Sequence, residues 1–499
     1  MDRRSSGILM HITSLPSLAG MGDLGPGAYR FLDFLDWSGQ TWWQVLPITP
    51  TQSVHGDCPY TSISAFAGNP LLISIEALVS QGLLSEADIP GSSDTASHIT
   101  DYDAARQVKE PLFQKAYQTF QHQAPRPDYE DFRQRHASWL ETYLLFKVIR
   151  DCHSGQPWST WPDSLRNREE RALRQFAAEH QEIIDYEAFI QYLFFSQWED
   201  LKRACGERGI RIIGDLPIYV DLDSADVWAH PEAFKLDEKG KPEVVAGVPP
   251  DYFSKTGQRW GNPVYSWEHL KEQGYGWWMD RMRHTLELFD VVRLDHFRGF
   301  AAYWEIPASE PTAIHGSWVP GPGSDFFEMV RNQLGSLPII AEDLGVITPD
   351  VERLRDQFGF PGMKILLFAF DESLPTNPYA PHNHIPGSLV YVGTHDNNTA
   401  PGWYRQETSP ADRQRLSDYF GNEVHAGNVH KVLTAAAMHS VARTVILTPQ
   451  DLLGLDEKAR MNTPGTRKGN WQWRITEEQL NSTIDDELRT LTSLTHRLR

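Results

Sequence analysis

Short apolar segments that end in polar or charged residues recur along the chain, and segments with helical periodicity separate them. Eight of these apolar segments have the length of a buried strand: residues 8–14, 42–48, 210–218, 291–297, 338–345, 363–370, 389–396 and 444–451. A closed (β/α)8 barrel requires eight parallel strands, and its chemistry lies at their carboxyl ends. The pattern therefore predicts the α/β class, with one (β/α)8 TIM barrel spanning residues 1–499.

Helical patterns fill most of the intervals between these segments. Apolar residues three or four positions apart form a face in Phe31, Leu32, Phe34, Leu35 and Trp37, and another in residues 277–289. Gly39 and Gly209 stand where two helices should end. Residues 484–498 predict one last amphipathic helix, so we expect no separate C-terminal β-domain.

Three intervals are longer than an ordinary connection in a barrel. Residues 49–209 are rich in helical patterns and predict a mostly helical insertion together with a barrel helix. Residues 220–267 predict an active-site loop insertion that includes a flap, residues 248–263, and residues 306–324 predict a shorter insertion. Because all three follow the carboxyl ends of strands, we expect them to surround the active-site face.

Charge and composition narrow the choice of partners. With 66 acidic against 46 basic residues, the formal net charge of −20 disfavours nucleic acid and anionic lipid. No apolar run has the length of a membrane span, and the N-terminal apolar run is too short for a secretory signal. The three cysteines are far apart, which favours a reducing cytoplasm over a disulfide framework. A neutral substrate is the simplest partner.

Carboxylates follow four of the predicted strands. Asp215, Asp295, Glu342 and Asp396 stand at the ends of the third, fourth, fifth and seventh segments. Each alone could cap a helix or form a salt bridge, but in barrel order all four converge on one mouth. Crowded carboxylates raise one another's pKa, whereas a cationic neighbour keeps an acid ionised. We therefore expect one acid to be protonated and another ionised.

The segment RLDHFRG, residues 293–299, supplies such a cationic neighbour. Alternation along a strand puts Arg293 and Asp295 on the same side, so the guanidinium should keep Asp295 ionised as a nucleophile requires. Glu342 lies in the apolar setting PIIAEDLG without an adjacent cation, and suits a proton carrier. Retaining glycosidic chemistry uses this asymmetry, with the two carboxyl groups about 5 to 5.5 Å apart.

A metal site is the competing interpretation of these carboxylates. Acidic side chains at barrel strand ends also bind Mg²⁺ or Zn²⁺, and His11, His296 and His395 could add ligands. However, no His-x-His pair stands at a strand end, and Arg293 would repel a cation. We therefore predict neither a metal nor another cofactor.

Five motifs in order resemble the α-amylase superfamily and, within it, the amylomaltases or 4-α-glucanotransferases of glycoside hydrolase family 77. They are CPYTSISAFAGNPLLIS from residue 58, VPPDYFSKTGQRWGNP from residue 248, RLDHFRG, AEDLG and GTHDNNT. The resemblance extends from ILMHITSLPS to MNTPGTRKGNWQWR. It implies an enzyme that transfers a segment of a 1,4-α-D-glucan to the 4-hydroxyl of glucose or of another α-1,4-glucan. Maltooligosaccharides would be its partners.

The resemblance also implies roles for individual residues. Asp295 corresponds to the nucleophile, Glu342 to the general acid/base and Asp396 to a third carboxylate that holds sugar hydroxyls and stabilises the transition state. Four side chains would grip the donor sugar: Tyr60, Asp215, Arg293 and His395. Trp260 would belong to the flap over the acceptor side, and Asn262 beside it is assigned to substrate binding.

Two other functions use the same residues. An α-1,4-glucan hydrolase needs the same carboxylates. A glycan-binding protein built on a barrel that has lost its catalytic activity could also keep them. We attribute transfer to the flap, whose Tyr252, Phe253 and Trp260 would cover the acceptor and exclude water, with Gly257 and Gly261 as hinges. Cys58 stands where the family pattern has Ser, a small replacement that leaves the assignment of Tyr60 in place.

Overall fold

Eight parallel strands form the centre of the molecule. The computed structural model describes residues 3–89, 91, 97–250, 254–466, 468–480 and 484–499. The strands follow the order β10-β11-β12-β1-β2-β3-β6-β9 in one sheet. Their bounds are Ser5–Leu9 (β1), Trp42–Gln44 (β2), Arg211–Leu216 (β3), Val291–Leu294 (β6), Ile339–Ala341 (β9), Met363–Ile365 (β10), Leu389–Tyr391 (β11) and Thr444–Leu447 (β12). Seven of the eight predicted segments contain one of these strands, and the first, residues 8–14, overlaps β1 at Ile8 and Leu9.

The two edge strands of this sheet meet. Ala341, the last residue of β9, forms a parallel bridge with Gly362, directly before β10. The Ala341 N–H donates to the carbonyl of Pro361 at 3.0 Å. The sheet is thus closed, and the predicted barrel is confirmed.

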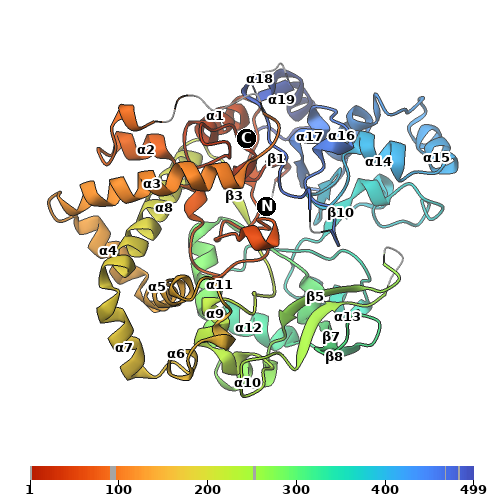
Figure 1. Ribbon diagram of the computed structural model, residues 1–499. Coiled ribbons are helices and arrows are strands. Elements are labelled where there is room, and N and C mark those ends of the chain that lie inside the picture. The colour runs from red at the N-terminus through yellow and green to blue at the C-terminus, as the bar shows by residue number, and fades with distance from the viewer. Residues whose placement is uncertain (1–2, 90, 92–96, 251–253, 467, 481–483) are drawn as a thin grey trace.

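The helices between the strands lie outside the barrel (Figure 1). The longer ones have the bounds Pro26–Trp37 (α1), Gln181–Glu207 (α8), Gly276–Leu288 (α11), Gly323–Leu334 (α12), Pro349–Gln357 (α13), Pro410–Phe420 (α15), Val429–His439 (α16) and Ile484–Leu494 (α19). The shorter ones are Ala225–Ala229 (α9), Trp267–Glu272 (α10), Ala400–Gln406 (α14), Pro449–Leu452 (α17) and Glu477–Leu480 (α18). No helix of the described residues combines the length and the apolarity needed to cross a membrane.

The predicted apolar face of α1 is correct for four of its five residues. Phe31, Leu32, Phe34 and Leu35 are buried, but Trp37 is 54% exposed and lies under the guanidinium of Arg489. Trp37 is the last residue of the helix, where the turn into Gly39 begins. Gly39 has φ +74° and Gly209 has φ +66°, so both helices end at left-handed glycines as predicted.

The predicted segments run past the strands they contain. Residues at the carboxyl ends leave the sheet early, as in the turn Ile12–Ser14 that follows β1. At its other end β1 begins at Ser5, because buried partners satisfy its two hydroxyl groups. Ser6 Oγ donates to Gln40 at 2.7 Å, and the indole N–H of Trp42 donates to Ser5 Oγ at 2.9 Å. Because Ser5 and Ser6 are polar, the apolar pattern did not include them in the predicted strand.

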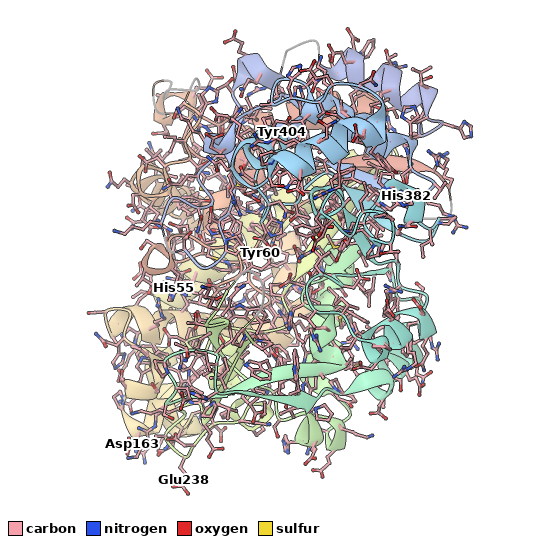
Figure 2. The ribbon with its side chains drawn as sticks, turned by 90° about the vertical axis from the view of Figure 1, so that its right-hand side faces the viewer. His55, Tyr60, Asp163, Glu238, His382 and Tyr404 are labelled. Atoms are coloured by element: carbon pink, nitrogen blue, oxygen red, sulfur yellow. The ribbon has the colours of Figure 1, made fainter. Side chains whose placement is uncertain are left out.

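Helices dominate residues 49–209, which occupy one side of the barrel in Figure 1. Before α8 they comprise Ile75–Ser80 (α2), Tyr102–Gln121 (α3), Pro127–Arg135 (α4), Ala137–Cys152 (α5), Asp163–Arg166 (α6) and Glu170–Glu179 (α7). The C-terminal part of α8 returns to the barrel and contacts β3. The side view of Figure 2 places Tyr60 at mid-height, between Tyr404 above and Glu238 below.

A second, four-stranded antiparallel sheet lies beside the barrel, and the sequence did not predict it. Its order is β5-β4-β7-β8, with β4 Val244–Val248, β5 Gln258–Pro263, β7 Ala302–Pro307 and β8 Ser317–Pro320. The predicted flap, residues 248–263, contains the last residue of β4 and the whole of β5, and these two strands pair as the β4–β5 hairpin. Because β4 also pairs with β7, the hairpin is anchored to the strand that follows the RLDHFRG segment.

Candidate active site

Parallel register brings the acidic side chains of three neighbouring strands to one rim. Asp215 of β3 is paired with Arg293 of β6. Asp295 and Glu342 lie directly after β6 and β9, and the Glu342 N–H donates to the carbonyl of Leu294 at 3.2 Å. Paired residues on adjacent strands point to the same face, so these side chains meet at the carboxyl end of the barrel.

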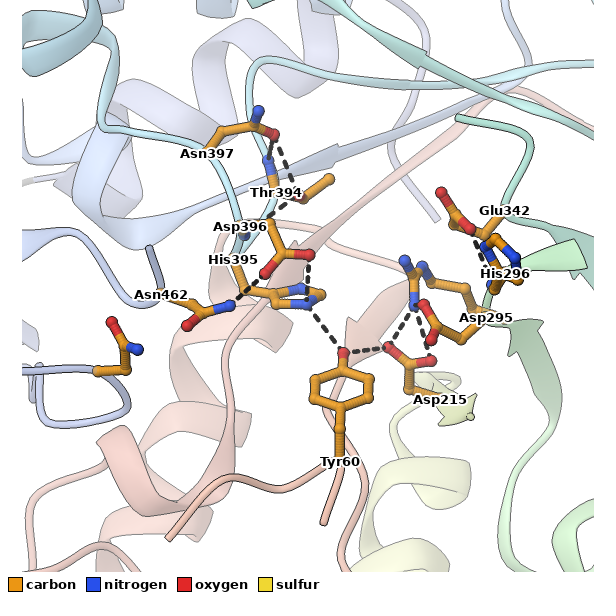
Figure 3. A network of polar contacts seen from close by, with 12 residues as sticks. Tyr60, Asp215, Asp295, His296, Glu342, Thr394, His395, Asp396, Asn397 and Asn462 are labelled. Carbon is orange, nitrogen blue, oxygen red and sulfur yellow. Dashed lines mark hydrogen bonds and ion pairs between the residues drawn. The ribbon is translucent and has the colours of Figure 1, made fainter. Parts of the chain in front are cut away.

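Arg293 joins Asp215 and Asp295, two of the carboxylates labelled in Figure 3. Its Nη1 donates to both carboxylate oxygens of Asp215 and to Oδ1 of Asp295, each at 2.8 Å. The residue is only 3% exposed. Burial works against its charge, but Asp215 and Asp295 hold the pKa of Arg293 well above its usual value. A permanent cation is therefore fixed between two carboxylates.

The pKa of Asp295 reflects both its burial and its cationic neighbour. Burial raises this pKa to about 6, the Arg293 guanidinium opposes the rise, and Asp215 and Asp396 add to it. An acid with this pKa is mainly ionised at neutral pH. The role of Asp295 as the nucleophile stays a prediction.

Glu342 also has a raised pKa. Burial raises the pKa of Glu342 well above its usual value; Arg293 opposes the rise, and the charges of Asp295 and Asp343 add to it. Its Oε2 accepts the backbone N–H of His296 at 2.8 Å. A raised pKa favours the protonated form, which suits the predicted role of Glu342 as a proton carrier.

Tyr60 and His395 extend the network away from Glu342. The Tyr60 hydroxyl donates to Oδ2 of Asp215 at 2.8 Å and lies 2.9 Å from Nε2 of His395. Tyr60 has one hydroxyl hydrogen, so His395 must donate from Nε2 to the Tyr60 oxygen. Burial lowers the pKa of His395, which keeps the ring neutral. The contacts therefore assign the proton of His395 to Nε2.

Asp396 lies on the same side as His395 and opens to solvent, with 42% of its side chain exposed. Its Oδ1 accepts from the amide of Asn462 at 2.6 Å, and its backbone oxygen accepts from Arg460 at 2.8 Å. Sequence reasoning missed Asn462 and Arg460. Both lie before or within the motif MNTPGTRKGNWQWR, which supported the family resemblance but carries no strand-end signal.

The described part of the flap reaches the other side of the rim. The Trp260 ring stands edge-on to the His296 ring, with centroids 4.7 Å apart, and Trp260 is 38% exposed. Asn262 does not join the network, because its amide donates to the carbonyl of Val220 at 2.9 Å. Its role in substrate binding stays a prediction. Tyr252 and Phe253, predicted to cover the acceptor, lie outside the described residues.

The three histidines considered as metal ligands do not form one cluster. His11 and His395 line the same cavity, and His395 also lies beside Asp396, whereas His296 lies beside Glu342. Burial, together with the nearby His395, lowers the pKa of His11 to about 3. Within the described ranges, no group of three or more His, Cys, Asp or Glu side chains could hold a metal ion.

Comparison with known proteins gives the same picture along the whole chain. A family model of 4-alpha-glucanotransferases matches residues 10–480. The 4-alpha-glucanotransferases of Thermus thermophilus and Synechocystis are 48% and 46% identical to it, and each match covers 99% of this chain and at least 98% of the relative. Among solved structures, the amylomaltase from Streptococcus agalactiae in complex with acarbose has a TM-score of 0.95 at 39% identity over 100% of both chains. The amylomaltase from Corynebacterium glutamicum shares the fold, with a TM-score of 0.76 at 19% identity over 99% of this chain and 75% of that one.

Proposed function

The chain belongs to glycoside hydrolase family 77, the 4-α-glucanotransferases or amylomaltases, and on this premise we propose how its side chains divide the work. Its activity is 4-α-glucanotransfer, which moves a segment of an α-1,4-glucan to a new 4-hydroxyl group. One observation carries the assignment of roles. Arg293 holds Asp215 and Asp295 together, while Glu342, whose pKa is raised, directly follows the next strand.

In the first step Asp295 attacks the anomeric carbon of the donor. Glu342 gives its proton to the departing glycosidic oxygen, so the bond to the leaving sugar breaks as the bond to Asp295 forms. The raised pKa of Glu342 supplies that proton at neutral pH. The product is a covalent glycosyl-enzyme and a shortened glucan.

In the second step the 4-hydroxyl of an acceptor attacks the same carbon. Glu342, now a carboxylate, takes the hydroxyl proton, and the bond to Asp295 breaks. Two displacements at one carbon retain the α-configuration, so a new α-1,4 bond results. Charge that returns to Asp295 is stabilised by the Arg293 guanidinium at 2.8 Å.

The donor sugar lies, in this proposal, against the side of the rim formed by Tyr60, Asp215, His395 and Asp396. Hydrogen bonds join Tyr60 to Asp215 and to His395, and His395 lies beside Asp396, so the four polar groups are connected. Part of the Asp396 carboxylate faces solvent. Asn462 holds Asp396 in this orientation. Trp260 stands at the opposite side, next to Glu342 and His296, where the acceptor would enter.

The substrates follow from the family and from its acarbose complex. Acarbose is bound by the amylomaltase from Streptococcus agalactiae, which supports α-glucans as the substrate class. We assign maltooligosaccharides as donors, and glucose or another α-1,4-glucan as acceptors. We also keep the proposals that residues 1–499 form one catalytic barrel with insertions at 49–209, 220–267 and 306–324, and that the chain, whose three cysteines are all free, works in the cytoplasm.

The product pattern on maltotriose tests this function. Transfer should convert maltotriose into glucose and a ladder of shorter and longer maltooligosaccharides, and Asp295→Asn should give no ladder. Asp280→Asn, an exposed carboxylate on α11, is the matched control and should act like the wild type. Glucose and maltose without longer chains would instead establish the α-1,4-glucan hydrolase.

A further inference from the structure

His296 occupies an unusual backbone position between the two catalytic carboxylates. It directly follows Asp295 and has φ +51° and ψ +49°, the left-handed region that side chains other than glycine rarely adopt. In this conformation its N–H points at Oε2 of Glu342, at 2.8 Å. The next N–H, of Phe297, donates to the backbone oxygen of Glu342 at 3.2 Å. The left-handed turn thus sets where Glu342 lies relative to Asp295.

The imidazole of His296 connects this turn to the flap. The Trp260 ring meets it edge-on, with ring planes at 86° and centroids 4.7 Å apart. On the barrel side, a Cβ at Gly299 would lie 3.2 Å from Cδ2 of His296, so the ring is packed closely there as well. Burial and the nearby Arg298 lower the pKa of His296 to about 3. The imidazole is therefore neutral, and it acts through packing rather than through charge.

We propose that His296 is a positioning residue that couples the flap to the general acid/base. The contact of Trp260 with the imidazole holds the left-handed turn, and the turn holds the backbone N–H of His296 on Glu342. A strained backbone persists only where its surroundings determine it, and Trp260 and Gly299 are the surroundings here. The inference rests on the role of Glu342 proposed above, and adds to it a path from the flap to the reacting proton.

This path predicts that a change in the flap alters the proton affinity of Glu342. The charged groups that act on Glu342 are Arg293, Asp295 and Asp343, and Tyr379 also lies within electrostatic range. None of them belongs to the β4–β5 hairpin. The N–H of His296 stabilises the ionised carboxylate, so its loss should raise the pKa of Glu342.

The test is the pH dependence of kcat/KM for transfer from maltotriose. Weaker acceptor binding would lower kcat/KM by the same factor at every pH. The proposed coupling instead shifts the pH at which kcat/KM declines, so the two effects can be told apart. Trp260→Ala should move the alkaline limb upward by about half a pH unit, because Glu342 then keeps its proton longer. His296→Asn should move it similarly, since Asn tolerates the left-handed turn but lacks the ring that touches Trp260.

The decisive measurement is the double variant, Trp260→Ala with His296→Asn. If His296 carries the coupling, its alkaline limb coincides with that of either single variant. Additive shifts, or a Trp260→Ala limb that stays at the wild-type position, would overturn the proposal. Trp37→Ala removes another exposed tryptophan, in α1, and should leave the limb unchanged.

A further variant separates this inference from the proposed function. Glu342→Gln should lower kcat/KM for maltotriose far more than for α-maltosyl fluoride, whose leaving group needs no proton. If both substrates lose activity equally, then Glu342 is not the general acid, and the proposed function fails whatever His296 does.

Discussion

Replacing the nucleophile by its neutral isostere should make the protein more stable at pH 8, although it abolishes activity. Asp295 is packed near Asp215 and Asp396, and burial raises its pKa to about 6. An acid whose pKa is higher in the folded than in the unfolded state destabilises the fold when it ionises. Asp295→Asn removes that ionisation and keeps an oxygen that can accept from Arg293.

The size of the effect follows from the two pKa values. The interval from 3.8 to about 6 corresponds to about 3 kcal/mol of unfolding free energy at pH 8, because one pH unit is worth about 1.4 kcal/mol. Part of this is offset, since 28% of the side chain is exposed and the variant loses a charged hydrogen bond to Arg293. We therefore expect a net gain of about 1 to 2 kcal/mol at pH 8.

The direction of the pH dependence is also determined. Between pH 3.8 and about 6 the folded state binds more protons at Asp295 than the unfolded state does, so the wild type loses stability as pH rises through this window. At pH 5 the folded wild type is largely protonated at Asp295 and bears about half of the penalty. The advantage of Asp295→Asn should therefore be smaller at pH 5 than at pH 8 by about 1.4 kcal/mol.

Denaturant unfolding of wild type and variant at pH 5 and pH 8 measures both quantities. Asp280→Asn, whose side chain is 54% exposed, controls for the general loss of an acidic group and should change stability by less than about 0.5 kcal/mol. The reasoning is refuted if Asp295→Asn is less stable than the wild type at pH 8. It is equally refuted if the variant has the same advantage at both pH values.

Four further predictions concern the reaction. The rate of transfer from maltotriose should decline below about pH 6, where Asp295 takes up a proton, and Glu342→Gln should lower kcat about 10² to 10⁴-fold in steady-state assays. Tyr60→Phe deletes the hydroxyl that joins two side chains of the donor side and should lower kcat/KM about tenfold; an unchanged value would remove Tyr60 from the site. Asn462→Ala releases the Asp396 carboxylate and should also lower kcat/KM about tenfold, whereas an effect on the unfolding midpoint alone would make Asn462 merely structural.

The barrel was predictable because its strands are buried on both faces. Segments such as residues 291–297 begin with consecutive apolar residues rather than with alternating ones. This pattern can be recognised in the segment alone, without knowing which strands lie beside it. The small sheet has no such signal. Strand β5 is QRWGNP, mostly exposed or half-buried, with a Gly and a Pro inside it. Its neighbour β4 pairs with β7 through Val244 and Pro307, more than sixty positions away.

The groups of the active site also differ in whether the sequence reveals them. Carboxylates at strand ends were predictable because strand ends are recognisable in the sequence. Asn462 comes from an irregular segment, and the donor to Glu342 is a backbone N–H, which every residue except proline has. The pKa of Asp295 depends on how burial compares with one ion pair. That balance exists only in the assembled barrel.

The enzyme transfers sugars instead of hydrolysing them, and the carboxylates alone do not explain this choice. Asp295 and Glu342 would serve water and sugar equally well, so the choice must be made where the acceptor enters. In the proposed arrangement, the β4–β5 hairpin places Trp260 at that position, and β7, which begins a few residues after His296, holds the hairpin. The proposed bond-breaking groups then follow strands that sequence periodicity reveals, whereas the proposed control of the acceptor depends on a sheet assembled from two distant segments. Exchanging that sheet between a transferase and a hydrolase of this fold should therefore change the product ratio more than any exchange among the four strand-end carboxylates.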